Sequence, residues 1–240
     1  MVGASPYDRA VDVPSRSQAK KAGSTLRTTL RGDLADEDAF LAALDTMETW
    51  RRAHANPLVT ANNGLRHRAR SLRIAAEVTQ RSKRSQTILD KLRREPTLDL
   101  SRMQDIGGCR AVVETKDDLR GLEARILERL TPITHTDYIE HPRASGHRGV
   151  HIVVTYQERA IELQLRTRVM HAWALSTEAY SQDQGENLKQ DGEHPVQLFL
   201  RVAADMMALN EDGMPIPPEM AALREERRLA ALPYFMKGAS

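Results

Sequence analysis

Helix-type spacing of apolar residues is the main pattern in the first half of this sequence. After the acidic residues of 33–38, Phe40, Leu41 and Leu44 recur at the spacing of one helix face, and acids in a first turn favour a helix start. The pattern then predicts a helix after Pro57, a strand over 76–83 and a helix over 85–94. The polar stretch ahead of these elements predicts a flexible arm over residues 1–32.

Strand patterns dominate the middle of the chain, and helical patterns dominate its end. The predicted elements are a strand at 109–114, a helix at 117–130, strands near 133–139, 148–156 and 159–166, and helices near 168–181, 194–210 and 218–231. A proline-rich turn at 213–218 separates the last two helices. This order of elements mixes α and β structure.

Composition restricts the class of protein. The 240 residues suffice for one catalytic domain with helical additions or for two small domains. Charged residues make up 28% and aromatic residues 4%, which is typical of a soluble, helix-rich protein. No apolar run approaches the roughly 20 residues of a membrane span, and the start lacks a signal-peptide core. The single cysteine, Cys109, cannot form an internal disulfide, and no Cys/His cluster has zinc-ligand spacing, so we expect a cytoplasmic protein.

Charge is distributed unevenly along the chain. Residues 51–94 contain twelve Lys or Arg against two acids, Glu77 and Asp90, a net charge of +10 in a chain whose formal net charge is +2. A basic segment in an otherwise acidic chain indicates phosphate-rich ligands or RNA. The alternative, for the part ahead of Arg81, is a solvated helix face.

Residues 81–91 place basic side chains at a predicted strand-to-helix junction. Arg81 and Lys83, two positions apart on a strand, project from one face. Thr87 and Lys91, four positions apart on a helix, share another face. Together these side chains are suited to holding a triphosphate by charge-assisted hydrogen bonds, and a solvated basic edge is the alternative.

Two acidic residues lie on or beside predicted strands. Asp105 precedes a glycine pair, which lets a ligand approach closely, and it is either a magnesium ligand or the cap of a turn. The strand at 161–166 alternates strictly, and its polar face carries Glu162, Gln164 and Arg166. A half-exposed strand explains this alternation equally well. Glu162 and Asp105 would supply the two carboxylates that magnesium-assisted phosphoryl transfer requires.

A loop at 137–151 is dense in Arg and His among Pro, Ser and Gly. Such loops are usually mobile surface, but cationic and planar side chains are also suited to stacking on a base and binding phosphates. Metal binding by its histidines is a further alternative, although no acid or cysteine completes a familiar ligand set.

These four segments, in this order, resemble the RelA/SpoT nucleotidyltransferase family, including its small alarmone synthetases. The resemblance covers roughly residues 57–190. The matching motifs are R-x-K-x-x-x-[ST]-x-x-x-K at 81–91, D-x-x-G-x-R at 105–110, E-x-Q-x-R-T at 162–167 and the loop DYIEHPRASGHRGVH at 137–151. The resemblance implies an α+β fold in which a mixed, mainly antiparallel sheet is flanked by helices, with additional N- and C-terminal helices.

The resemblance also implies roles for individual residues. Arg81 and Arg110 would sandwich the adenine of ATP. Asp105 and Glu162 would bind Mg²⁺ as catalytic residues, and Glu162 would also activate the acceptor's 3′-hydroxyl. The residues implied on the ATP side are Arg81, Lys83, Thr87, Lys91, Arg110, Gln164 and Arg166. Those implied on the acceptor side are Arg143, His147, Arg148, His151 and His171.

The loop departs from the family pattern at three positions. His147 stands where the family has the tyrosine that stacks on the acceptor's base, Arg143 where it has lysine, and Gly149 where it has serine. His171 stands where small synthetases often have asparagine. Because histidine offers a smaller stacking surface than tyrosine, the identity of the acceptor stays open.

The resemblance implies a pyrophosphokinase that moves the β,γ-diphosphate of ATP to the 3′-hydroxyl of GDP or GTP, giving (p)ppGpp and AMP. One alternative is a toxin that modifies the 3′-terminal adenosine of tRNA and inhibits translation, and another is an inactive nucleotide- or RNA-binding module. We expect a synthetase domain over residues 33–190 and a helical extension over 191–240. The expected partners are ATP, the acceptor, a neutralising antitoxin or separate hydrolase, and a second copy of the chain, but no membrane.

Overall fold

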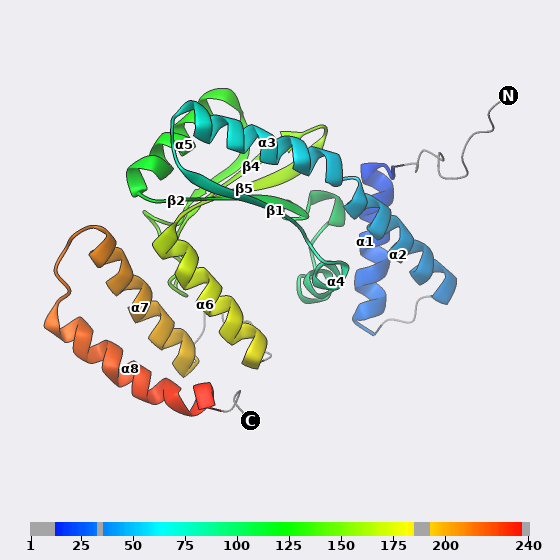
Figure 1. Ribbon diagram of the computed structural model, residues 1–240. Helices are drawn as coiled ribbons and strands as arrows, with labels where there is room; N and C mark the ends of the chain where they lie inside the picture. The colour runs from blue at the N-terminus through cyan, green and yellow to red at the C-terminus, as the bar shows by residue number, and fades with distance from the viewer. Residues whose placement is uncertain (1–12, 33–35, 185–192, 237–240) are drawn as a thin grey trace. The chain divides into compact units, whose positions relative to one another are not determined.

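The computed structural model describes residues 13–32, 36–184 and 193–236 (Figure 1). The chain divides into two compact units. Unit 1 comprises residues 1–64, 79–109 and 153–162, and unit 2 comprises residues 65–78, 110–152 and 163–240. Each unit is described below by itself.

The strands form a five-stranded, mostly antiparallel sheet in the order β1-β2-β5-β4-β3. The strands are β1 (Ala76–Ser82), β2 (Gly107–Val113), β3 (Pro132–Asp137), β4 (Val150–Tyr156) and β5 (Arg159–Thr167). Gln157 and Glu158 join β4 to β5 with positive φ angles of 45° and 65°, as a two-residue hairpin turn requires. The predicted α+β fold with a mainly antiparallel sheet is confirmed.

Unit 1 packs α1 (Arg16–Leu30), α2 (Glu37–Arg52) and α4 (Ser85–Arg94) around an apolar cluster, and it also contains the start of α3 (Ala55–Ser71). A short 3₁₀ turn follows α4 at Leu100–Arg102. Leu26 of α1, Trp50 of α2 and Ile88 of α4 are all buried in this cluster. The helices predicted after Pro57 and over 85–94 are therefore present, although α3 already begins at Ala55.

Helix α1 differs from the flexible arm predicted over residues 1–32. A capping box starts the helix, because the side chain of Ser15 accepts from the Gln18 N–H while the Gln18 side chain accepts from the Ser15 N–H. The buried face consists largely of small residues, and a Cβ added to Gly23 would lie 2.6 Å from Leu100 Cβ. Such a face carries little hydrophobic signal, which is why the pattern failed here. Residues 1–12 of the predicted arm lie outside the described residues.

Unit 2 holds the other helices. They are the end of α3, then α5 (Lys116–Arg129), α6 (Arg168–Gln184), α7 (Pro195–Glu211) and α8 (Pro218–Met236). Trp173 of α6, Leu200 of α7 and Ala231 of α8 are buried in one cluster, and α7 and α8 run side by side in Figure 1. The two helices predicted near 194–210 and 218–231 are thereby confirmed.

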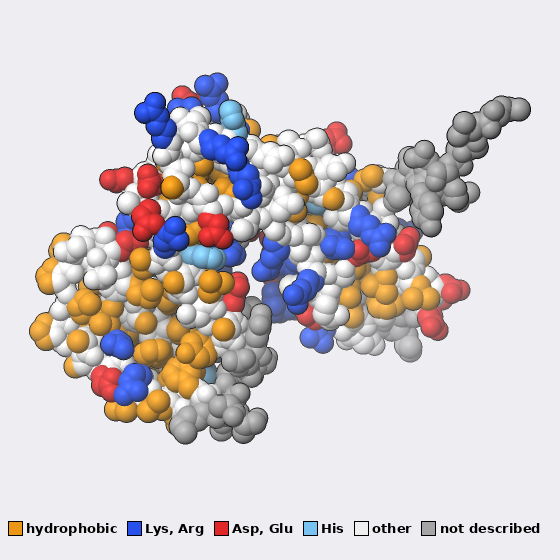
Figure 2. Space-filling view, in the orientation of Figure 1, with side chains coloured by type: hydrophobic (Ala, Val, Ile, Leu, Met, Phe, Trp, Pro, Cys, Tyr) orange, Lys and Arg blue, Asp and Glu red, His pale blue; other side chains and the backbone are white. Residues whose placement is uncertain are grey.

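Apolar side chains are also exposed on the C-terminal helices. Figure 2 shows them gathered over α7 and α8, where Leu223 is 38% and Leu229 is 54% exposed. Within the described ranges, no helix combines the length and the hydropathy that crossing a bilayer demands.

Candidate active site

In unit 1, the carboxylate of Asp105 lies between two lysines. Lys83, directly after β1, donates from Nζ to Asp105 Oδ2 at 2.8 Å. Lys91, on the last turn of α4, donates to Oδ1 at 3.3 Å and to Oδ2 at 3.2 Å. The backbone N–H of Lys83 also donates to the Ile106 carbonyl at 2.8 Å, which fixes the end of β1 beside the start of β2. Three residues predicted from two separate motifs are thus brought together.

The charge of Asp105 is set by these neighbours. Burial by itself would raise the pKa of this carboxyl group, but the positive charges of Lys83 and Lys91 and their hydrogen bonds outweigh it and hold the pKa below its ordinary value. Asp105 is therefore ionised at neutral pH. Two ammonium groups and one carboxylate leave a net positive cluster, which suits a polyphosphate.

Glu162 lies on β5 beside Gly108 of β2. A Cβ added to Gly108 would be 3.7 Å from the Glu162 carbonyl oxygen and 4.0 Å from Glu162 Oε2. These are ordinary van der Waals distances, so Gly108 and Glu162 are neighbours on adjacent strands, and the close approach of a ligand beside Gly108 stays a prediction. The burial pattern of β5 confirms the alternation, with Ile161 and Leu163 buried and Glu162 partly exposed.

Arg81 and Thr87 flank this cluster along the chain. Arg81 lies near the end of β1 and Thr87 in the first turn of α4, and both side chains are exposed. Their assignment to ATP stays a prediction.

Helix α2 supports the junction between β1 and α4, which sequence reasoning missed. Glu48 accepts from Arg51 Nε at 2.9 Å and from Ser85 Oγ at 2.7 Å, while Arg51 Nη1 donates to Ser82 Oγ at 3.0 Å. The hydrogen bond from Arg51, opposed by burial and aided by Ser85, lowers the pKa of Glu48 to about 2. These partners lie 31 and 37 positions apart, so only packing reveals them.

Replacing Glu48 by glutamine should remove a pH-dependent part of the stability. Because the pKa of Glu48 falls from 4.5 to about 2 on folding, its contribution is complete above pH 4.5 and is lost as the pH falls towards 2. We expect Glu48→Gln to lower the free energy of unfolding by about 1 kcal/mol at pH 7, a value typical of partly exposed pairs. Urea unfolding at pH 7 and pH 3 measures this. A difference between the two proteins that stays constant with pH would contradict the assignment.

In unit 2, Gln164 links two arginines. Gln164 Oε1 accepts from Arg110 Nε and Nη2 at 3.4 Å and from Arg166 Nη2 at 3.3 Å. Burial lowers the pKa of His171, and the positive charges of Arg110 and Arg166 lower it further, against two glutamates that act in the opposite direction. His171 is therefore neutral at pH 7 and can both donate and accept a hydrogen bond. Arg166 is only 5% exposed, so the polar face of β5 is buried at this end of the strand.

Three aromatic rings meet beside residues 138–149, the loop between β3 and β4. Tyr138 packs edge-on against His147 and His151, with ring centroids 5.5 Å and 5.2 Å apart. The two histidine Nε2 atoms are 3.2 Å apart. Arg143 lies over the Tyr138 ring at 4.5 Å and donates to its hydroxyl at 2.6 Å. Three of the predicted acceptor-side residues, Arg143, His147 and His151, therefore form one cluster.

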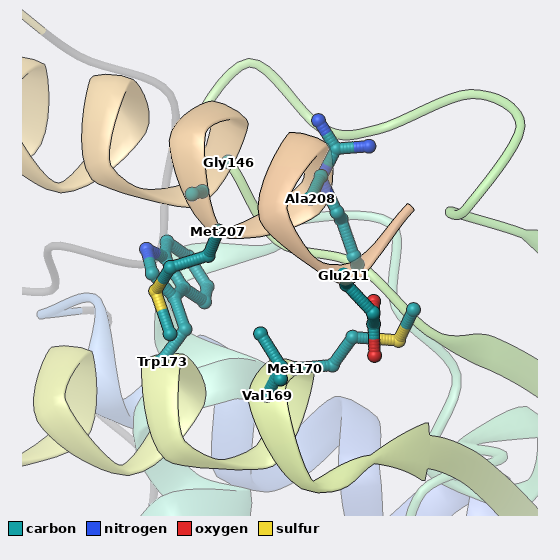
Figure 3. Close-up of a pocket in the computed structure, with 9 residues that line it drawn as sticks. Gly146, Val169, Met170, Trp173, Met207, Ala208 and Glu211 are labelled. Atoms are coloured by element: carbon teal, nitrogen blue, oxygen red, sulfur yellow. The ribbon is translucent and has the colours of Figure 1, made fainter. Parts of the chain in front are cut away.

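Arg148, the fourth predicted acceptor-side residue of this segment, points towards α7. Arg148 Nη2 donates to Asp205 Oδ1 of α7 at 2.9 Å. A small pocket that Arg148 helps to line lies beside it, and Figure 3 shows Trp173 with Met207 on one side and Met170 with Glu211 on the other. Sequence reasoning did not find Asp205, which lies 57 positions from its partner.

Comparisons with known proteins agree with this fold. The chain resembles the solved small alarmone synthetase 1 from Bacillus subtilis bound to its product pppGpp, at 27% identity and a TM-score of 0.57, covering 75% of this chain and 98% of that one. A GTP pyrophosphokinase family protein from Streptococcus pneumoniae has a TM-score of 0.57 at 24% identity, covering 76% and 97%, and supports the fold alone. The fold is that of the small alarmone synthetases.

Two sequence comparisons also find similar proteins. Residues 80–184 match the model described as the region found in RelA / SpoT proteins. The chain is also 29% identical over 172 residues to GTP pyrophosphokinase YjbM of Bacillus subtilis (strain 168), covering 67% of this chain and 77% of that protein. The chain therefore carries the RelA/SpoT region, and its relatives include pyrophosphokinases.

Proposed function

We propose that this protein transfers the β,γ-diphosphate of ATP to the 3′-hydroxyl of GDP or GTP, forming (p)ppGpp and AMP. The observation that carries the proposal is the Lys83–Asp105–Lys91 cluster at the junction of β1 and α4. The names of the relatives, a GTP pyrophosphokinase and a synthetase bound to pppGpp, point in the same direction.

The cluster suits the polyphosphate of ATP. Each lysine ammonium has three donors, so Lys83 and Lys91 can each keep a bond to Asp105 and donate another to a phosphate oxygen. Phosphoryl transfer needs positioning and compensating positive charge more than covalent catalysis. In this proposal Arg81 and Thr87 complete the ATP side from their neighbouring positions.

Glu162 is the proposed general base. The 3′-hydroxyl oxygen of the acceptor attacks the β-phosphorus, the bond from that phosphorus to the α,β-bridging oxygen breaks, and AMP leaves. The hydroxyl proton passes to the Glu162 carboxylate. The partial exposure of Glu162 on β5 supports this role, because a substrate hydroxyl must come within hydrogen-bond reach.

The residues present fit Mg²⁺. Within the described ranges, no three His, Cys, Asp or Glu side chains converge on a common metal position. Mg²⁺ needs no such cage, because it binds through one or two carboxylates together with substrate phosphates and water. Asp105, which is ionised, and Glu162 would hold it, and the ion would neutralise charge on the transferring group.

On the acceptor side we propose roles for the cluster of unit 2. His147 and His151 are planar rings suited to a base or a phosphate, and Arg143 supplies a cation beside them. His147 is smaller than the tyrosine of the family pattern, which keeps the 3′ end of tRNA as the second candidate acceptor.

The deciding experiment follows a labelled β-phosphate. Purified protein is incubated with Mg²⁺, ATP and, in separate reactions, GDP, GTP or deacylated tRNA. Label in a guanosine nucleotide with release of AMP supports the proposal. Label on tRNA would instead support a toxin that modifies tRNA and inhibits translation. No labelled product with any acceptor would favour an inactive module.

We also propose that the apolar face of α8 is where a second copy or a neutralising protein docks. Leu223 and Leu229 are exposed there, and Figure 2 shows further apolar side chains exposed around them over α7 and α8. A contiguous exposed apolar patch, unlike single exposed residues, marks an interaction site. We expect Leu229→Lys to shift the mass measured by light scattering towards the monomer. If the wild-type protein is a monomer, self-association through this face is excluded. Binding of a co-expressed protein from a neighbouring gene would then be compared between the wild type and Leu229→Lys.

A further inference from the structure

The 138–149 loop is seated on α6 and α7. Gly146 has a φ angle of +91°, and a Cβ added to it would lie 2.9 Å from Ala204 Cβ, 3.2 Å from Arg201 Cα and 3.2 Å from Trp173 Cζ2. The loop backbone therefore approaches these helices more closely than any side chain at this position would allow. Figure 3 shows Gly146 beside α7, close to the labelled residues of the pocket.

The helices of this seat are joined to one another. Trp173 Nε1 of α6 donates to the Leu200 carbonyl of α7 at 2.8 Å, and the indole is 6% exposed. The ring of His147 lies 6.2 Å from the Trp173 ring. Helices α6 and α7 thus contact the loop close to His147, so they can determine where this histidine lies.

Arg148 ties the loop to α7. Its Nη2 donates to Asp205 at 2.9 Å, and its side chain is only 19% exposed. The Nε atom is buried and has no hydrogen-bond partner in the part of the chain that the structure describes. The guanidinium is therefore turned towards α7 and largely removed from solvent, and its charge is already partly compensated by Asp205.

We propose that Asp205 is a positioning residue for the acceptor side, and that Arg148 acts by holding the loop on α7 rather than by binding the acceptor. This inference rests on the proposed function, because the acceptor site is part of it. It gives α7 (Pro195–Glu211), which lies beyond the matched region at 80–184, a direct part in placing His147.

The test compares Asp205→Asn with Asp212→Asn. Asp212 ends the same helix and pairs with Lys116 at 2.5 Å, so it offers an equally exposed ion pair away from the loop. Asp205→Asn should raise KM for the acceptor about fivefold, the effect of a partly exposed pair, and leave KM for ATP unchanged. Asp212→Asn should change neither value.

A charge swap separates positioning from direct binding. Combining Arg148→Asp with Asp205→Arg restores an ion pair between loop and helix, and should recover most of the lost acceptor affinity. If Arg148 bound a phosphate of the acceptor directly, moving the arginine to position 205 would not restore acceptor affinity. If Arg148 binds the acceptor itself, Asp205→Asn would leave KM for the acceptor unchanged or lower it, and the charge swap would not restore acceptor affinity. Either result would overturn the inference.

Hydrogen exchange tests the seat without any reaction. In the wild type, the Gly146 N–H donates to the Arg143 carbonyl at 2.8 Å and the Tyr138 N–H to the Gly149 carbonyl at 2.9 Å. Asp205→Asn should speed exchange of these amides severalfold, and Asp212→Asn should not. If the wild type transfers diphosphate to no acceptor but Asp205→Asn still speeds exchange of these amides, the proposed function fails while the attachment of the loop to α7 is supported. If Asp205→Asn leaves their exchange unchanged, Asp205 does not hold the loop on α7.

Discussion

Replacing Glu162 by glutamine is expected to reduce pyrophosphate transfer about 10²–10⁴-fold, the usual contribution of a general base. Glutamine keeps the shape of the side chain but cannot accept the proton of the attacking hydroxyl. Since Glu162 is partly exposed, the fold should be unaffected. AMP release with each acceptor, and thermal unfolding, are the measurements.

Glu158→Gln is the matched control for this variant. Glu158 lies in the β4–β5 turn, on the same hairpin and in the same unit as Glu162, and its side chain is exposed. It should retain wild-type activity. Near-normal product formation by Glu162→Gln would remove the residue from the proposed mechanism, whereas loss of activity in both variants would indicate damage to the hairpin.

Replacing Asp105 by asparagine should lower kcat/KM for ATP about 10²–10³-fold, as when a group that stabilises transition-state charge is removed. The amide carries no charge to hold Lys83 and Lys91, so both ammonium groups lose the partner that orients them. It is also a weaker ligand for Mg²⁺. Steady-state kinetics with varied ATP at saturating acceptor give the value.

Asp90→Asn provides the control for charge removal near α4. Asp90 pairs with Arg93 at 3.9 Å and its side chain is 46% exposed, so its loss should change kcat/KM for ATP less than twofold. Activity of Asp105→Asn within threefold of the wild type would show that the carboxylate is dispensable. In that case the lysines alone would have to hold the polyphosphate.

The succession of helices and strands could be predicted because it is encoded locally. Alternation along residues 159–166 and helical spacing in segments such as 85–94 depend only on neighbours in the chain, and both match the structure closely. Helix α1 was not predicted, because its buried face consists of Ala19, Ala22 and Gly23 beside Leu26. Small residues of this kind do not form a recognisable apolar stripe.

The sequence by itself determined the residue types of the candidate site, namely two lysines, two carboxylates and a loop rich in Arg and His. Only the tertiary structure decided which of them meet. It joined Lys83 and Lys91 on Asp105, set Glu48 of α2 behind the β1–α4 junction, and turned Arg148 towards Asp205. These pairs are 14 to 57 positions apart, and their formation depends on how separate elements pack, which no local pattern of residues records.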